Sequence, residues 1–175
     1  MKEDNPNDKV YTQEFIVNEV ISEFRPYINK FETILEPFRG GGAFYDKLLP
    51  LSDNPVGWCE IDEGIDFFDY NIVHDWIITN PPYSSFDKVL PKCLELAENV
   101  VLVIPVNKLF SSMPRLMDVK RAGFGIRQVH YLGSGRQLGF PFGFPVAAVW
   151  VQKGWDNGIT DTYEPRCYEA KRKKF

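Results

Sequence analysis

Apolar and polar positions alternate along the chain in blocks that predict helices and strands in turn. Apolar residues recur every three or four positions over 12–27 and over 84–97, as they do on the buried face of an amphipathic helix. A helix is also expected over 43–49, and a mixed helical segment over 108–122. Short apolar runs of strand length lie at 33–35, 56–59, 76–78, 100–104, 126–132 and 145–151. This order of elements favours an open α/β sheet.

Two local details refine these elements. The run 100–104 is apolar at every position, which is typical of a strand buried on both faces of a parallel sheet. Thr12 precedes the first helix and Glu14 falls in its first turn, so we expect Thr12 to be the N-cap.

The run 76–78 is followed, after one threonine, by Asn80-Pro81-Pro82-Tyr83. Proline donates no backbone hydrogen bond and drives the residue before it out of helical geometry, so a stiff turn is predicted at the carboxyl end of this strand. In an open α/β sheet, ligands bind at that edge. The amide oxygen of Asn80 and the carbonyl of Pro81 can accept the two N–H bonds of a planar amino group, and Tyr83 offers a ring. Such a grip would stabilise the charge that grows on the nitrogen during methyl transfer. The simpler alternative is a rigid turn without chemistry.

A glycine-rich loop, Glu36-Pro37-Phe38-Arg39-Gly40-Gly41-Gly42, joins the first short strand to the helix at 43–49. Glycine lets the backbone approach a ligand closely and adopt positive φ, although an ordinary flexible turn has the same composition. Glu60 ends the second strand about 20 residues later, where a carboxylate suits the hydroxyls of a ribose. We favour Glu60 over Asp62 because it directly follows the apolar run.

Two further segments carry aromatic residues with alternative explanations. Asp66 and Phe67 could hold an adenine by its amino group and its ring face, or Phe67 could belong to the core. The loop at 133–144 contains an arginine and three phenylalanines alternating with glycine and proline. These are Phe140, Phe142 and Phe144. They either pack into the core or form an aromatic wall for a flat substrate.

Composition and charge limit the partners. The 175 residues suit one domain, and 44% of them are hydrophobic, which is ample for a core. The net charge of -4 excludes a global basic field, so a nucleic acid would need a local patch. Cys59, Cys93 and Cys167 lack metal-ligand spacing, so no metal is expected, and their odd number suits a cytoplasmic location. Cys59 and Cys93 are expected in the core.

The ends of the chain are polar. Residues 1–10 read as a polar extension and not as a signal peptide, and no apolar run reaches the length of a membrane span. The main domain is expected over 11–156. Residues 157–175 are expected to form a basic tail whose Lys171–Lys174 cluster is either solvated or in contact with phosphate.

Together the glycine loop and the Asn80–Tyr83 turn resemble motifs of Class I S-adenosylmethionine-dependent amino-methyltransferases, and most closely those of DNA adenine-N6 methyltransferases. Residues 36–42 resemble the F-x-G-x-G motif of that group, and residues 80–83 are similar to its [DNS]-P-P-[YFW] motif. The order of the two motifs resembles the γ arrangement. The resemblance implies a Rossmann-like fold, with a seven-stranded, mostly parallel sheet, an antiparallel last strand and helices on both faces.

The resemblance also implies roles for individual residues. Those expected to hold S-adenosyl-L-methionine are Thr12, Glu36, Phe38, Gly40, Gly42, Glu60, Asp66 and Phe67. Those expected in catalysis are Asn80, Pro81, Pro82 and Tyr83. Those expected to hold the target ring are Tyr83 and one of Phe140, Phe142 and Phe144.

The expected function is therefore methylation of adenine N6 in DNA, with methylation of an RNA base or of protein glutamine as the alternative. A non-catalytic, cofactor-binding regulatory subunit is a third possibility. The sequence departs from the group because it has no separate target-recognition region between the motifs or after Trp155. Recognition would then come from a partner subunit or a second copy, and small enzymes of this build occur in phages and prophages. A DNA substrate would need its target base flipped out of the stack.

Overall fold

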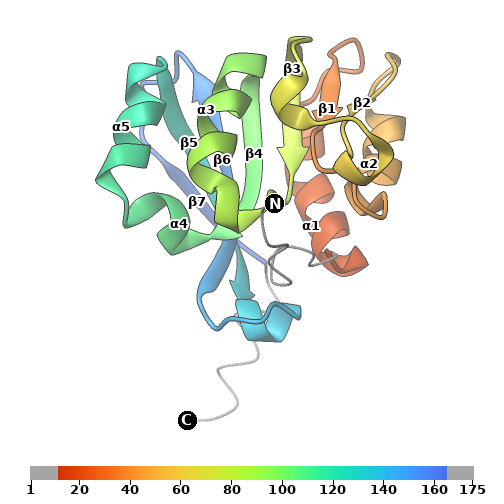
Figure 1. Cartoon of the computed structure of the whole chain (residues 1–175). Coiled ribbons are helices and arrows are strands. Elements are labelled where there is room, and N and C mark those ends of the chain that lie inside the picture. The colour runs from red at the N-terminus through yellow and green to blue at the C-terminus, as the bar shows by residue number, and fades with distance from the viewer. Residues whose placement is uncertain (1–11, 165–175) are drawn as a thin grey trace.

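The apolar runs of the sequence form the strands of one seven-stranded sheet, in the order β2-β1-β3-β4-β6-β5-β7 (Figure 1). The computed structural model describes residues 12–164. The strands are β1 (Ile34–Glu36), β2 (Gly57–Trp58), β3 (His74–Thr79), β4 (Ala97–Pro105), β5 (Phe124–Ser134), β6 (Pro145–Lys153) and β7 (Thr160–Tyr163). The α-helices are α1 (Glu14–Phe24), α2 (Ala43–Leu48), α3 (Phe86–Leu96), α4 (Val106–Phe110) and α5 (Met113–Arg121). The predicted α/β class is confirmed.

The sheet is mostly parallel, as expected. Strand β6 runs antiparallel to both of its neighbours, β4 and β5. Strand β7 pairs in parallel with β5, with Thr160 opposite Gln128 and Tyr163 opposite Tyr131. This strand lies within 157–175, where the sequence predicted a basic tail. Its four residues are short of apolar side chains, so no hydrophobic pattern marked it.

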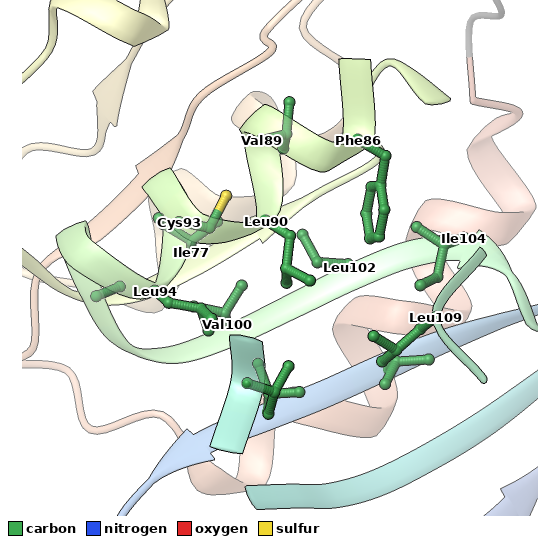
Figure 2. Packing of buried hydrophobic residues seen from close by; sticks show 14 of the residues in the cluster. Ile77, Phe86, Val89, Leu90, Cys93, Leu94, Val100, Leu102, Ile104 and Leu109 are labelled. Carbon is green, nitrogen blue, oxygen red and sulfur yellow. The ribbon is translucent and has the colours of Figure 1, made fainter. Parts of the chain in front are cut away.

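The central strands bury side chains on both faces, which explains their continuous apolar runs. Val100, Leu102 and Ile104 of β4 pack on the face covered by α3, and Figure 2 shows α3 residues lying over them. Val101 and Val103 face the opposite way and join the core that α1 and α2 cover. Each such side chain contributes roughly 1.5–3 kcal/mol on burial. Cys59 and Cys93 are buried, as expected.

Two predicted helices have different boundaries in the structure. Helix α1 begins at Glu14 with Gln13 at its N-cap and no side-chain capping bond, so the prediction that Thr12 is the cap was wrong. The Thr12 hydroxyl instead accepts a hydrogen bond from Asn80. The segment 108–122 is divided between α4 and α5, because Pro114 is tolerated only in the first turn of a helix.

Helix α1 is held to the far edge of the sheet by polar groups. His130 of β5 is 2% exposed, and its two ring nitrogens lie 2.8 Å from Thr162 Oγ1 of β7 and 3.0 Å from Glu19 Oε1 of α1. Gln128 Nε2 also donates to Thr162 Oγ1, at 3.0 Å. This network positions α1, and with it Thr12, against the sheet. No helix within 12–164 combines the length and the apolar character needed to cross a bilayer.

Candidate active site

The strand order reverses between β1 and β3. The chain passes from β1 outward to β2 and then returns to the other side of β1 to form β3 and β4. The loops that leave the carboxyl ends of β1 and β3 therefore diverge, and open α/β sheets bind ligands at such a switch point. β1 ends at Glu36, where the glycine loop begins, and β3 ends at Thr79, directly before Asn80. The structure thus brings the two sequence motifs together.

A buried carboxyl group ties these two loops to each other. Glu36 is 1% exposed, and its Oε1 accepts hydrogen bonds from Thr79 Oγ1 at 2.5 Å and from the Phe38 amide at 3.0 Å. Burial raises the pKa of Glu36 to about 8, although both hydrogen bonds act in the opposite direction. The carboxyl group therefore keeps its proton up to about neutral pH and links the start of the glycine loop to the residue before Asn80.

The glycine loop is an ordered turn. Gly42 has a φ of 87°, a conformation that only glycine adopts without strain, and its amide donates to Arg39 O at 2.8 Å directly before α2. The amide of Gly40 donates to Glu60 Oε2 at 2.6 Å. The loop after β1 is thus held by a hydrogen bond to Glu60, which follows the neighbouring strand β2.

Glu60 lies where a ribose-binding carboxylate is expected. Its Oε2 accepts from Gly40 and its Oε1 accepts from the amide of Asp62 at 3.1 Å, so each oxygen retains acceptor capacity. The side chain is half-buried, whereas Asp62 is exposed. Ile61, between them, is 69% exposed and offers an apolar surface beside this carboxylate.

Asp66 and Phe67 follow on the same side of the sheet. The Asp66 carboxylate accepts from the amide of Phe68 at 2.9 Å and is half-buried, so it has a further oxygen for an amino group. Phe67 is 3% exposed and packs edge-on against Phe38, with ring centroids 5.0 Å apart. The ring of Phe67 therefore lies in the core, where it supports Phe38 of the glycine loop.

The Asn80 amide is held at both ends. Its Nδ2 donates to Thr12 Oγ1 at 2.9 Å, and its Oδ1 accepts from the Tyr83 hydroxyl at 2.8 Å. The Tyr83 hydroxyl also lies 3.2 Å from Val103 O. Burial raises the pKa of Tyr83 well above its usual value, so the phenol stays a neutral donor. Pro81 is buried and Pro82 half-buried, so the turn is packed as well as stiff.

The three phenylalanines of the hairpin between β5 and β6 differ in burial. Phe140 is 4% exposed and belongs to the core, yet its ring lies 6.3 Å from that of Tyr83. Phe142 is half-buried, with its ring 5.8 Å from Tyr83 in an edge-on arrangement. Phe144 is 54% exposed. Phe140 therefore packs in the core as one alternative expected, while Phe142 and Phe144 remain accessible from the surface.

Three residues of the site were missed from the sequence. They are Thr79, Ile61 and Lys108, whose Nζ donates to the Tyr83 carbonyl at 3.1 Å. A weak signal existed for each of them. Thr79 and Lys108 are polar residues shortly after apolar strands, at the ligand-binding edge, and Ile61 is an apolar residue between two carboxylates. Within 12–164, no cluster of three or more His, Cys, Asp or Glu residues is arranged to hold a metal ion.

Solved structures of other proteins share the fold of this chain. No family model matches the sequence, and no curated protein matches it. A protein of Pyrococcus horikoshii assigned as an RNA methyltransferase has a TM-score of 0.63 at 16% identity, over 87% of this chain and 90% of that one. A protein of Listeria monocytogenes assigned as a class I S-adenosylmethionine-dependent methyltransferase has a TM-score of 0.66 at 10% identity, over 95% and 71%. A Vibrio vulnificus protein assigned as a modification subunit of a type I restriction enzyme has a TM-score of 0.62 at 13% identity, over 89% and 46%. The chain therefore has the Rossmann-like Class I methyltransferase fold.

Proposed function

We propose that this chain transfers a methyl group from S-adenosyl-L-methionine to an amino nitrogen, and that its acceptor is N6 of adenine in DNA. One observation carries the proposal. The Asn80 amide oxygen and the Tyr83 ring meet at the switch point between β1 and β3, beside an ordered glycine loop.

The acceptor amine is held by Asn80, Pro81 and Tyr83. An exocyclic amine on a heteroaromatic ring is a poor nucleophile because its lone pair is delocalised into the ring. When Asn80 Oδ1 and the Pro81 carbonyl accept its two N–H bonds, the lone pair is favoured outward, toward the methyl donor, and the growing positive charge is stabilised. The Tyr83 hydroxyl already donates to Asn80 Oδ1, so the amine uses the second lone pair of that oxygen. The Tyr83 ring stacks on the target base.

The residues present fit the cofactor. When bound, S-adenosylmethionine supplies a methyl group on a positively charged sulfur. Glu60 would accept hydrogen bonds from the ribose hydroxyls, and Asp66 would accept one from the adenine amino group. The adenine ring would lie on Ile61, which is exposed beside Glu60. Phe67 acts from the core by supporting Phe38. The remaining residues that would line the cofactor site are Thr12, Glu36, Gly40 and Gly42.

Adenine in DNA is favoured by the resemblance of the two motifs and by the aromatic hairpin. The hairpin rings of Phe140 and Phe142 lie 6.3 and 5.8 Å from the Tyr83 ring, so they offer aromatic surface to a flat base at the target position. The solved structures with this fold include an assigned restriction-modification subunit, of which this chain spans 46%. A partner subunit or a second copy of this chain would supply recognition of a DNA sequence.

The test is the mass of the methylated product. Purified protein and S-adenosylmethionine are incubated with genomic DNA, total RNA or a protein extract, and nucleosides and amino acids are analysed by mass spectrometry. Wild type should produce N6-methyladenine in DNA, and Asn80→Ala should not. The Asn80→Ala protein must still bind the cofactor, which shows that it is folded.

The other outcomes separate the alternatives. A methylated RNA base or methylated glutamine would keep the reaction and replace the acceptor. Cofactor binding without product in any fraction would indicate a regulatory subunit. If Asn80→Ala still forms the methylated product, Asn80 takes no part in the reaction.

A further inference from the structure

A continuous row of aromatic rings leads from the catalytic turn to the protein surface. From Tyr83 the next ring is Phe142 at 5.8 Å, and Phe142 is stacked on Phe140 at 5.3 Å with an angle of 25° between the planes. Phe144 follows at 6.4 Å from Phe142. Among the three phenylalanines exposure rises in chain order, from 4% at Phe140 through half-buried Phe142 to 54% at Phe144. The target base accounts for the inner rings, and it leaves Phe144 without a role.

The row is held in place by the hairpin backbone. The Gly135 amide donates to Phe144 O at 2.9 Å, and the Phe140 amide donates to Gly135 O at 2.8 Å. A methyl group on Gly135 would lie 2.7 Å from the Phe142 ring, so that ring rests directly on the glycine backbone. The hairpin projects beyond the rest of the sheet in Figure 1, at the lower edge of the view. The exposed phenylalanine is therefore part of an ordered platform.

A cation accompanies the row. The Arg136 side chain lies over Gly143, with Nε and Cζ at 3.6 and 3.9 Å from where a Cβ would stand, and Gly143 separates Phe142 from Phe144 in the chain. Arg136 is exposed and forms no ion pair with any residue of 12–164. Several other cations toward this edge of the sheet are engaged within the fold. Arg39 pairs with Glu63, Lys47 with Glu14 and Arg115 with Asp87, and Lys108 donates to the Tyr83 carbonyl. Arg136 is thus free to contact a phosphate.

We propose that the substrate is presented to this site as a single strand, with the base next to the target stacked on Phe144 and its phosphate on Arg136. Open aromatic rings with a basic group alongside are what sequence-tolerant binding of single strands requires, because unstacked bases expose their π-faces. A base inside a duplex is already stacked on its neighbours and cannot lie on Phe144. Duplex binding also draws its affinity from many phosphate contacts, which a net charge of -4 does not favour. The inference rests on the proposed function for the position of the target base.

The test compares strands and variants by direct binding. The full chain is titrated into fluorescein-labelled oligonucleotides with one adenine, prepared as single-stranded DNA, as RNA of the same sequence and as duplex DNA, and anisotropy is measured. The variants are Phe144→Ala, Phe144→Tyr, which keeps a ring, and Arg136→Gln. The matched control is Phe31→Ala, because Phe31 is also an exposed phenylalanine, at 69%, but precedes the amino end of β1.

Wild type should bind a single strand at least about tenfold more tightly than the duplex. Phe144→Ala should weaken single-strand binding by about 5- to 140-fold, which is the usual range for one stacked base. Phe144→Tyr and Phe31→Ala should bind as wild type does, and Arg136→Gln should bind more weakly and with a smaller dependence on salt. The DNA and RNA arms show which nucleic acid the platform prefers.

The inference falls if the duplex binds more tightly than the single strand, if Phe144→Ala binds as wild type, or if no nucleic acid binds. These results are distinguishable from failure of the proposed reaction. If no adenine is methylated but Phe144→Ala still loses single-strand affinity, the reaction is wrong and the platform stands. If adenine is methylated and the duplex is preferred, only the platform is wrong.

Discussion

The side-chain amide of Asn80 shows how single residues set up this site. An amide can flip, exchanging its oxygen and nitrogen, and only the oxygen can accept from a target amine. In the structure Thr12 Oγ1 accepts from the nitrogen and the Tyr83 hydroxyl donates to the oxygen, so a hydroxyl group holds each end of the amide. This orientation, with the oxygen as an acceptor, is the one that the proposed methyl transfer needs.

Replacing Tyr83 separates its ring from its hydroxyl. Tyr83→Phe keeps the stacking face and loses the hydrogen bond to Asn80, so kcat/KM on an adenine oligonucleotide should fall by about 2- to 12-fold, the worth of one such bond. Tyr83→Ala removes both and should be much less active. Equal loss in the two variants would show that the hydroxyl, and not the ring, is essential.

Thr12→Val tests whether Thr12 acts on Asn80 or on the cofactor. Valine keeps the shape and removes the acceptor for Asn80 Nδ2, so kcat should fall by about 2- to 12-fold, while Thr12→Ser should retain activity. Cofactor affinity, measured by calorimetry, should not change. A loss confined to cofactor affinity would instead support the role near the methionine that the family resemblance implies.

The buried carboxyl group of Glu36 should make stability depend on pH. Its folded pKa, about 8, lies above the ordinary value of 4.5, so the folded state binds the extra proton between these values. The contribution to stability is complete below pH 4.5 and is lost as pH rises through about 8, at no more than about 1.4 kcal/mol per pH unit. Denaturant unfolding of wild type and Glu36→Gln at several pH values should show this fall in wild type only. Parallel pH profiles would mean that Glu36 does not titrate in this range.

At the scale of elements, the site is assembled from loops that the sheet brings together. The glycine loop follows β1, the Asn80 turn follows β3, and the aromatic hairpin joins β5 to β6. Each loop is short and is anchored by a strand end, so the positions of the functional groups follow from the strand order. Rigid strands with diverging loops explain how a small domain can offer a precise site.

A side chain at Gly135 should disturb the whole hairpin between β5 and β6. In Gly135→Ala the added methyl group would stand 2.5 Å from Phe142 O and 2.7 Å from the Phe142 ring, which forces the ring away. We expect weaker binding of single-stranded oligonucleotides and unchanged cofactor affinity. Gly158→Ala is the control, since a Cβ there meets no atom within 4 Å. If Gly135→Ala binds oligonucleotide normally, the position of Phe142 does not matter for substrate.

For the whole molecule, cofactor binding should stabilise the fold, because the cofactor would contact loops from several strands at once. A ligand that binds only the folded state contributes about 2.7 kcal/mol at 100 times its dissociation constant. S-adenosylmethionine should therefore raise the melting temperature of wild type in a thermal-shift assay. Glu60→Ala should lose most of this rise, whereas Asp62→Ala, which removes an exposed neighbouring carboxylate, should keep it. A full rise in Glu60→Ala would remove Glu60 from the cofactor site.

Local patterns in the sequence were enough to predict six of the seven strands, most helices and the two motif loops. Hydrophobic periodicity indicates which faces are buried, proline restricts the backbone and glycine permits positive φ, so these signals can be interpreted from the local sequence alone. β7 escaped because its pairing with β5, and not its own apolar content, makes it a strand. The division of the three phenylalanines between core and surface was likewise open, since burial depends on what packs against each ring.

The Asn80 turn and the glycine loop could thus be predicted from consecutive residues alone, because their conformations are local. The link from Thr12 to Asn80 spans 68 residues and that from Glu36 to Thr79 spans 43. Hydrogen bonds over such separations exist only once the chain has folded and the strand ends lie side by side, so the contacts of the Asn80 amide and the protonation of Glu36 are properties of the folded chain.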